Sequence, residues 1–190
     1  MGTDRLNQEE KLALLEIARQ SLERKIGGEK LSPLDLESMS PHLREWGASF
    51  ITLTILEKLR GCVGALEPYQ PLALDVREHT IAAAQDDPRF PPVNPRELAQ
   101  IHIEISRLTT PAPLEYKDPE DLLSKLRPNV DGLIVQDGIR RATFLPQVWE
   151  KIPKKSEFLD NLCLKMGVPA NTWRRRHLDM RVYQVEEFHE

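Results

Sequence analysis

Hydrophobic and polar residues alternate with a period of two over Ala48–Leu66, which predicts two strands joined by a short turn. In the first strand, isoleucine or leucine occupies every second position. If the second strand keeps this period, Arg60, Cys62 and Gly64 share one face. Glycine weakens a strand and usually marks a close backbone approach, so Gly61 and Gly64 make this hairpin a candidate functional site.

A helical period is present in several other segments. The first helix is expected over Asn7–Ile26, with Leu12, Leu15, Leu22 and Ile26 on one stripe, and Asn7 with Glu10 resembles a capping box. The remaining expected elements are helices at Pro71–Gln85 and Pro119–Leu126, a helix capped by Ser156 and closed by Gly167, a strand at Ile101–Leu108, a hairpin at Gly132–Phe144 turning at Asp137-Gly138, and a last strand at Met180–Phe188.

The expected strands are joined by hairpins or long irregular links, without regular crossover helices. This connectivity favours an α+β fold, with a mostly antiparallel sheet flanked by helices. A chain of 190 residues fits one domain over residues 1–190, with a core at about 8–188 and room for a small second lobe.

Composition and charge narrow the classes of function. A net charge of −4 gives no basic excess, which argues against a dedicated nucleic-acid binder. No apolar run approaches the roughly 20 residues that span a bilayer, and the N-terminal segment lacks the apolar region of a signal peptide. The two cysteines, Cys62 and Cys163, do not make a disulfide framework. We therefore expect a cytoplasmic protein without membrane contact.

Cys62 has two interpretations. It could be a nucleophile, because Arg60, if close, would favour its thiolate. However, no motif places His79 or His102 beside it as a base. Free cysteine is among the most often buried residue types, so a packed core thiol is the favoured interpretation.

Glu104 and Ser106 lie on the face of the Ile101–Leu108 strand that carries no isoleucine. In one interpretation, Glu104 is an acid–base carboxylate in a cleft where Arg60 and Arg89 hold an anionic substrate. In the other, the same groups form a satisfied charge network that fixes the register of the sheet. The residues leave both interpretations open.

The acidic run Asp86–Phe90, which includes Asp87, could bind a hard cation. More often such a run ends a helix with an Asx turn. The chain has no zinc-ligand spacing of standard type and no glycine-rich phosphate loop. We therefore expect no metal and no cofactor.

Trp173–His177 is the one segment that combines several basic residues with an aromatic one. It could contact RNA or the acidic face of a partner. A solvated turn with its tryptophan directed inward is the favoured interpretation, because the chain as a whole is acidic.

Several segments resemble, in the same order, those of the AMMECR domain family. The family hallmark is an LRGCIG-like hexapeptide, which Leu59–Gly64 matches with valine at residue 63. The other similar segments are Ala83-Ala84, Asp87–Pro91, Glu97-Leu98, Ile103–Ser106, Asp131–Ile134, Leu145–Trp149, Phe158-Leu159 and Lys165–Gly167. Within the family, the chain is most similar to the bacterial AmmeMemoRadiSam system protein A.

This resemblance implies a two-lobed α+β fold. It also implies functional association with a Memo-like protein of the ring-opening dioxygenase fold and with a radical SAM protein. Three hypotheses follow: an enzyme or enzyme component of a modification pathway, a non-catalytic adaptor or substrate-binding subunit that uses the same cleft, and a nucleic-acid-binding module, which the acidity disfavours. The candidate catalytic residues are Cys62 and Glu104, and the candidate substrate-binding residues are Arg60, Gly61, Gly64, Asp87, Arg89 and Ser106.

Overall fold

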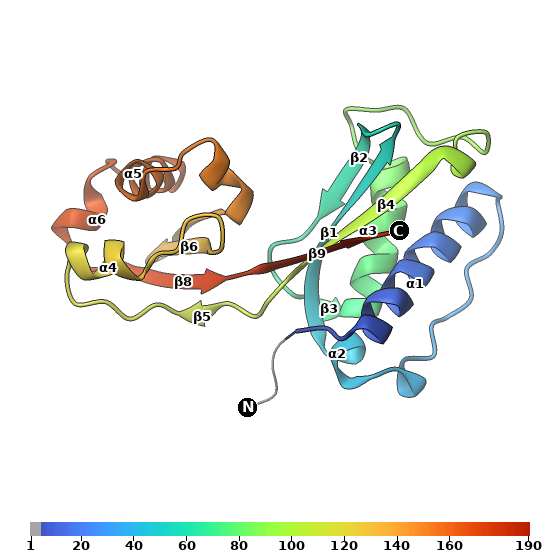
Figure 1. Ribbon diagram of the computed structural model, residues 1–190, viewed down its shortest axis with the longest axis horizontal. Helices are drawn as coiled ribbons and strands as arrows, with labels where there is room; N and C mark the ends of the chain where they lie inside the picture. Colours follow the sequence, from blue (N-terminus) through green and yellow to red (C-terminus); the bar gives the residue numbers. More distant parts are fainter. Residues whose placement is uncertain (1–4) are drawn as a thin grey trace. The chain divides into compact units, whose positions relative to one another are not determined.

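The computed structural model describes residues 5–190, which fold into two compact units (Figure 1). Unit 1 comprises the chain up to Thr109 together with Glu186–Glu190, and unit 2 comprises Thr110–Val185. Each unit has its own sheet and its own hydrophobic core, and the α+β class is confirmed. The N-terminal segment expected not to be a signal peptide begins with residues 1–4, which lie outside the described range.

The helices of the described part of the chain include none that could cross a membrane, since each is too short or too polar.

Unit 1 is built on a five-stranded sheet with the strand order β2-β1-β4-β9, in which the short β3 pairs with the start of β1. Its strands are β1 (Trp46–Ile55), β2 (Lys58–Gly64), β3 (Gln70–Pro71), β4 (Ile101–Leu108) and β9 (Val185–His189). Its helices are α1 (Gln8–Ile26), α2 (Pro41–Arg44), α3 (Leu72–Gln85) and the 3-10 helices η1 (Leu36–Ser38) and η2 (Leu98–Gln100).

Helices α1 and α3 cover one face of this sheet. The alternating Ile51, Leu53, Ile103 and Ile105 are fully buried there, in one cluster with the apolar residues of both helices. The opposite face carries the intervening residues of β1 and β4, and we call it the open face. The hydrophobic core of unit 1 therefore uses one face of the sheet.

Helix α1 begins as its sequence predicts. Asn7 and Glu10 form a complete capping box, in which each side chain accepts a hydrogen bond from the other residue's backbone N–H. The predicted stripe is partly wrong, because the side chain of Leu12 is 55 % exposed while Leu14 and Ala18 are buried. The buried face of the helix is thus rotated from the predicted one. The pattern of polar residues along the helix did not indicate this rotation.

Unit 2 contains a four-stranded sheet with the strand order β5-β8-β6-β7, in which the pairings are antiparallel. Its core includes three large aromatic side chains, Trp149, Phe158 and Trp173. Its strands are β5 (Ala112–Pro113), β6 (Gly132–Asp137), β7 (Arg140–Phe144) and β8 (Asp179–Tyr183), and its helices are α4 (Pro119–Lys125), η3 (Pro146–Glu150), α5 (Lys155–Lys165) and α6 (Thr172–Arg175).

Three details of this half of the chain differ from expectation. The β6–β7 hairpin is present, but its turn residues are Gly138-Ile139, because Asp137 already pairs with Arg140. Ser156 lies inside α5, whose N-cap position is Lys154, because the helix starts earlier than the serine suggests. The expected strand Met180–Phe188 is interrupted at Gln184, because β8 and β9 belong to different sheets.

Strand β2 and helix α3 approach each other closely at Gly61. A Cβ atom on residue 61 would lie 2.1 Å from the carbonyl oxygen of Ala83. We expect Gly61→Ala to lower the free energy of unfolding by about 3 kcal/mol, because backbone must move to admit the methyl group. Urea unfolding followed by circular dichroism measures this change.

Gly138→Ala is the control, because its added Cβ meets no atom within 4 Å. The only cost is that alanine must adopt a positive φ, which lowers the free energy of unfolding by about 1 kcal/mol. Equal losses in the two variants would contradict the packing explanation.

Candidate functional site

The pairing of β1 with β2 contains a β-bulge at Arg60. Leu53 pairs with Gly61 and Thr54 with Leu59, so Arg60 is the extra residue. The extra residue interrupts the simple alternation on which the prediction that Arg60 shares a face with Cys62 and Gly64 depends. Cys62 and Gly64 pair with Thr52 and Phe50, whose side chains belong to the open face.

Cys62, Thr52 and Glu104 form a row across three strands of the open face. Thr52 of β1 is the register partner of Cys62 in β2 and of Glu104 in β4. Its hydroxyl donates a hydrogen bond to the Cys62 sulfur over 3.5 Å. Because neighbouring strands lie about 4.8 Å apart, the backbones of Cys62 and Glu104 are separated by about 10 Å. The structure thus brings the two candidate catalytic residues onto one face without direct contact.

Gly64, Phe50 and Ser106 form the next row of this face. A Cβ atom on residue 64 would lie 2.4 Å from the Ser49 carbonyl oxygen and 2.5 Å from both Cα and Cγ of Phe50, so the close approach of β1 requires glycine here. Ser106 is buried. The binding roles predicted for Gly64 and Ser106 stay predictions, and packing alone accounts for the glycine.

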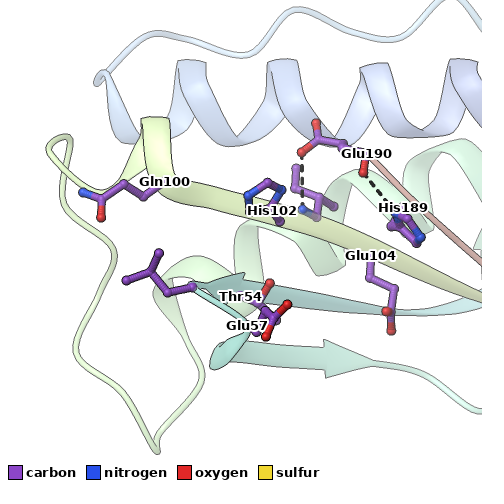
Figure 2. A pocket seen from close by; sticks show the side chains of 9 residues that line it. Thr54, Glu57, Gln100, His102, Glu104, His189 and Glu190 are labelled. Carbon is purple, nitrogen blue, oxygen red and sulfur yellow. Dashed lines mark hydrogen bonds between the residues drawn. The ribbon is translucent and has the colours of Figure 1, made fainter.

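A hollow of about 840 Å³ lies on the open face next to Glu104 (Figure 2). Its size suits a small molecule or a short peptide segment. Its lining contains three glutamates and two histidines but no lysine or arginine. The lining residues are Thr54, Leu56, Glu57, Gln100, His102, Ile103, Glu104, His189 and Glu190. A ligand in this hollow therefore meets acidic and imidazole groups.

Some of these side chains are held in place, and others are free. Arg19 holds the Glu190 carboxylate, and His189 Nδ1 lies 2.9 Å from the Glu190 backbone oxygen. The side chains of Glu104 and His102 make no hydrogen bond or ion pair with any residue between 5 and 190. These two groups are available to a ligand.

Within residues 5–190, histidine, cysteine and acidic side chains form no group of three or more that could hold a metal ion.

Arg60 is paired with Glu97 rather than with Glu104. Its Nε and Nη2 donate to the two carboxylate oxygens over 2.6 and 3.1 Å. These hydrogen bonds hold the pKa of Glu97 below its usual value, against the opposing effect of burial. The proposed ion pair of Arg60 with Glu104 is therefore absent, and the anion-binding role of Arg60 stays a prediction.

Asp87 and Arg89 bind the outer edge of β2 at Cys62. The Asp87 carboxylate accepts from the Cys62 backbone N–H over 2.8 Å, and Arg89 donates to the Cys62 carbonyl oxygen over 3.2 Å. Arg89 also donates to Asp87 through its backbone N–H and its guanidinium, and the first of these bonds is the expected Asx turn. The pair satisfies backbone groups that an edge strand otherwise leaves exposed.

The Arg89 hydrogen bonds hold the pKa of the buried Asp87 carboxyl well below its usual value, although burial opposes this shift. Asp87 is thus a charged brace for the cysteine strand. Its substrate-binding role, and that of Arg89, stay predictions.

The sequence argument considered His102 only as a base for Cys62 and named no histidine among the candidate site residues. His102 could have been assigned to the hollow, because it stands two residues before Glu104 on the same strand and therefore shares its face. His189 gave no such signal, because nothing local shows that β9 leaves the sheet of unit 2 and joins that of unit 1.

The AMMECR1 family model matches residues 15–188, and this chain belongs to that family. A protein of Methanothermobacter thermautotrophicus is 40% identical over 190 residues, covering 97% of this chain and 96% of that protein. Protein MJ0810 of Methanocaldococcus jannaschii is 34% identical over 192 residues, covering 97% and 92%. The crystal structure of uncharacterized protein PH0010 from Pyrococcus horikoshii superposes with a TM-score of 0.72 at 34% identity, covering 93% and 89%.

The lowered pKa of Asp87 predicts a pH-dependent contribution to stability. This contribution is fully present above the unfolded-state pKa of about 3.9 and is lost as the pH falls toward the lower folded-state value. We expect Asp87→Asn to destabilise the protein at pH 7 and to differ progressively less from wild type between about pH 5 and about pH 2. Urea midpoints across this range measure the difference.

Asp35→Asn, at an exposed carboxylate, is the control. A destabilisation by Asp87→Asn that does not change with pH would contradict a stabilising role for the Asp87 charge.

The two cysteines should differ in accessibility. Cys62 is half-buried, whereas Cys163 lies in the core of unit 2, where burial raises the pKa of its thiol. We expect iodoacetamide to label Cys62 in the folded protein and Cys163 only after unfolding. Mass spectrometry of the wild type, Cys62→Ser and Cys163→Ala assigns each adduct; protection of Cys62 until unfolding would remove it as a nucleophile.

Proposed function

We propose that this chain is a component of a modification pathway and binds its substrate on the open face of unit 1. Its partners in this pathway are a Memo-like protein of the dioxygenase fold and a radical SAM protein. Membership of the AMMECR1 family supports this proposal, together with the resemblance of Leu59–Gly64 to the family hallmark. The assignment to AmmeMemoRadiSam system protein A is itself part of the proposal.

The observation that carries the proposal is the free carboxylate of Glu104. It stands in a row with Thr52 and Cys62, beside a hollow large enough for a ligand. Arg60 of β2, by contrast, is paired with Glu97. A carboxylate that the fold does not use is available to bind a substrate or to transfer its protons.

In the enzymatic form of the proposal, Glu104 carries a proton and Cys62 is the nucleophile. Because Thr52 lies between them, a substrate reaches both only by lying across β1. Arg60 and Arg89 brace the strand that carries the cysteine. With no lysine or arginine in the hollow, the substrate group that enters it is neutral or cationic, rather than the anion that the sequence suggested.

A non-catalytic adaptor is the second candidate, and one observation favours it. Cys62 does not line the hollow, so a ligand can occupy the hollow without touching the thiol. The rim includes Leu56, which is 80 % exposed at the tip of the β1–β2 hairpin. An acidic hollow with an apolar rim suits a peptide segment that carries a basic side chain.

Reconstitution with the two partner proteins distinguishes these forms. Complex formation is measured by analytical gel filtration, and modification of the partners or of added cell extract is measured by mass spectrometry. For an enzyme, we expect Cys62→Ser and Glu104→Gln each to lower the rate of modification about a hundredfold or more, with complex formation unchanged.

Glu29→Gln, at an exposed carboxylate of unit 1, and Cys163→Ala are the matched controls. Full modification by Cys62→Ser with weaker complex formation by Glu104→Gln would select the adaptor. A wild-type chain that associates with neither partner and changes no product would overturn the pathway proposal.

A further inference from the structure

A second hollow lies wholly within unit 2, on the basic segment that begins at Trp173. Its volume is about 180 Å³. Five of its lining residues are basic or histidine, and one is acidic, so the lining has the opposite character to that of the open-face hollow. The lining residues are Tyr116, Lys117, Asp118, Pro119, Trp173, Arg174, Arg175, Arg176 and His177.

Two aromatic rings give this hollow a fixed wall. The Tyr116 hydroxyl donates to the Leu178 carbonyl over 3.0 Å and accepts from the Leu178 N–H over 2.7 Å. The His177 ring stacks on Tyr116, with ring centroids 4.1 Å apart and planes 17° apart. The imidazole thus lies against the Tyr116 ring, while the residue itself is exposed.

Two of the arginines are fixed by internal partners. Arg174 pairs with Asp160 over 2.8 Å and lies over the ring of the buried Trp173, 4.0 Å from its centroid. Arg176 pairs with Asp137. These arginines contribute positive potential but keep their guanidinium groups engaged.

The other cations of the lining are free for a ligand. The side chain of Arg175 makes no hydrogen bond or ion pair with any residue from 5 to 190. Lys117 interacts electrostatically with Asp121, but the Asp121 carboxylate is already bound by Lys125 over 2.8 Å. The Asp118 carboxylate caps α4 by accepting from the Asp121 N–H, so its charge is engaged too.

From this arrangement we infer that the unit 2 hollow binds a phosphate monoester group carried by a small molecule. The Arg175 guanidinium and the Lys117 ammonium hold the phosphate oxygens, and the His177 ring faces the carrier. The volume admits one phosphate group and a few neighbouring atoms, which is too little for a nucleic-acid strand. This inference concerns a different unit from the open face and does not depend on the proposed function.

The test is a titration of the ¹⁵N-labelled full chain, followed by amide chemical shifts. The ligands are O-phosphoserine, adenosine monophosphate and inorganic phosphate, and serine without its phosphate is the ligand control. We expect saturable shifts at residues 116–118 and 173–177 with the phosphate compounds and none with serine. Equal affinity for inorganic phosphate and phosphoserine would mean that the site binds the phosphate group alone. Tighter binding of adenosine monophosphate would mean that the adenine ring stacks on His177.

Variants decide whether the free cations hold the phosphate. Arg175→Gln and Lys117→Gln should each weaken phosphoserine binding about tenfold, because each removes a charged hydrogen-bond donor. Lys151→Gln, at an exposed lysine of the same unit that does not line the hollow, should leave binding unchanged. Within residues 5–190, the side chains of Arg175 and Lys117 make no hydrogen bond that the substitution would remove, and the amide spectrum without ligand confirms that each variant is folded.

The inference is overturned if phosphoserine shifts none of these amides, if serine shifts them equally, or if Arg175→Gln and Lys117→Gln bind as the wild type does. Preferential binding of a single-stranded RNA oligonucleotide with steep salt dependence would also overturn it, in favour of a nucleic-acid surface. Cys62→Ser and Glu104→Gln should bind phosphoserine normally, so the failure of either proposal can be recognised separately.

Discussion

Unit 1 depends on the close approach of α3 to β2. Only glycine at residue 61 allows the Ala83 carbonyl to lie against the strand, and Asp87, two residues after the helix ends, reaches back to the Cys62 N–H. The helix and the segment after it thereby cover one face and the outer edge of the strand. The hexapeptide Leu59–Gly64 is in large part a packing element: Gly61 admits the helix, Gly64 admits the neighbouring strand at Ser49 and Phe50, and Arg60 binds a carboxylate.

This packing separates the two faces of the sheet by role. The isoleucine face is buried under two helices and provides the hydrophobic stabilisation of unit 1. The open face carries polar side chains, of which Glu104 and His102 bind no other part of the described chain. The Cys62 thiol belongs to this face, while Asp87 and Arg89 bind the Cys62 backbone at the outer edge of the strand. Chemistry on the open face can therefore vary with little cost to the fold.

The sequence predicted much of the fold, because its signals are local. The capping box of Asn7, the isoleucine alternation of β4 and the β6–β7 hairpin are all present. Prediction from the sequence failed where contacts with residues distant in the chain, rather than the local pattern, determine the structure. Alternation cannot reveal a bulge at Arg60, and a run of strand-forming residues cannot reveal that the chain changes sheets at Gln184.

For the candidate site, alternation placed Glu104 and Ser106 on the face opposite the isoleucines, as the structure has them. The partners of Arg60 and Arg89 could not be predicted, because Glu97 and Asp87 are only two of many acidic residues in the chain. The hollow and its second histidine depend on the neighbourhood of β9 and β4, which is set by tertiary structure alone.

The most direct test of this account is the accessibility of successive residues along β4. In a background with Cys62→Ala and Cys163→Ala, single cysteines are introduced as His102→Cys, Ile103→Cys and Glu104→Cys, and their maleimide labelling rates are compared in the folded chain. The account predicts labelling at 102 and 104 and protection at 103, with substrate or partner slowing the first two. Protection at all three positions would mean that the open face is covered, and that the site lies elsewhere.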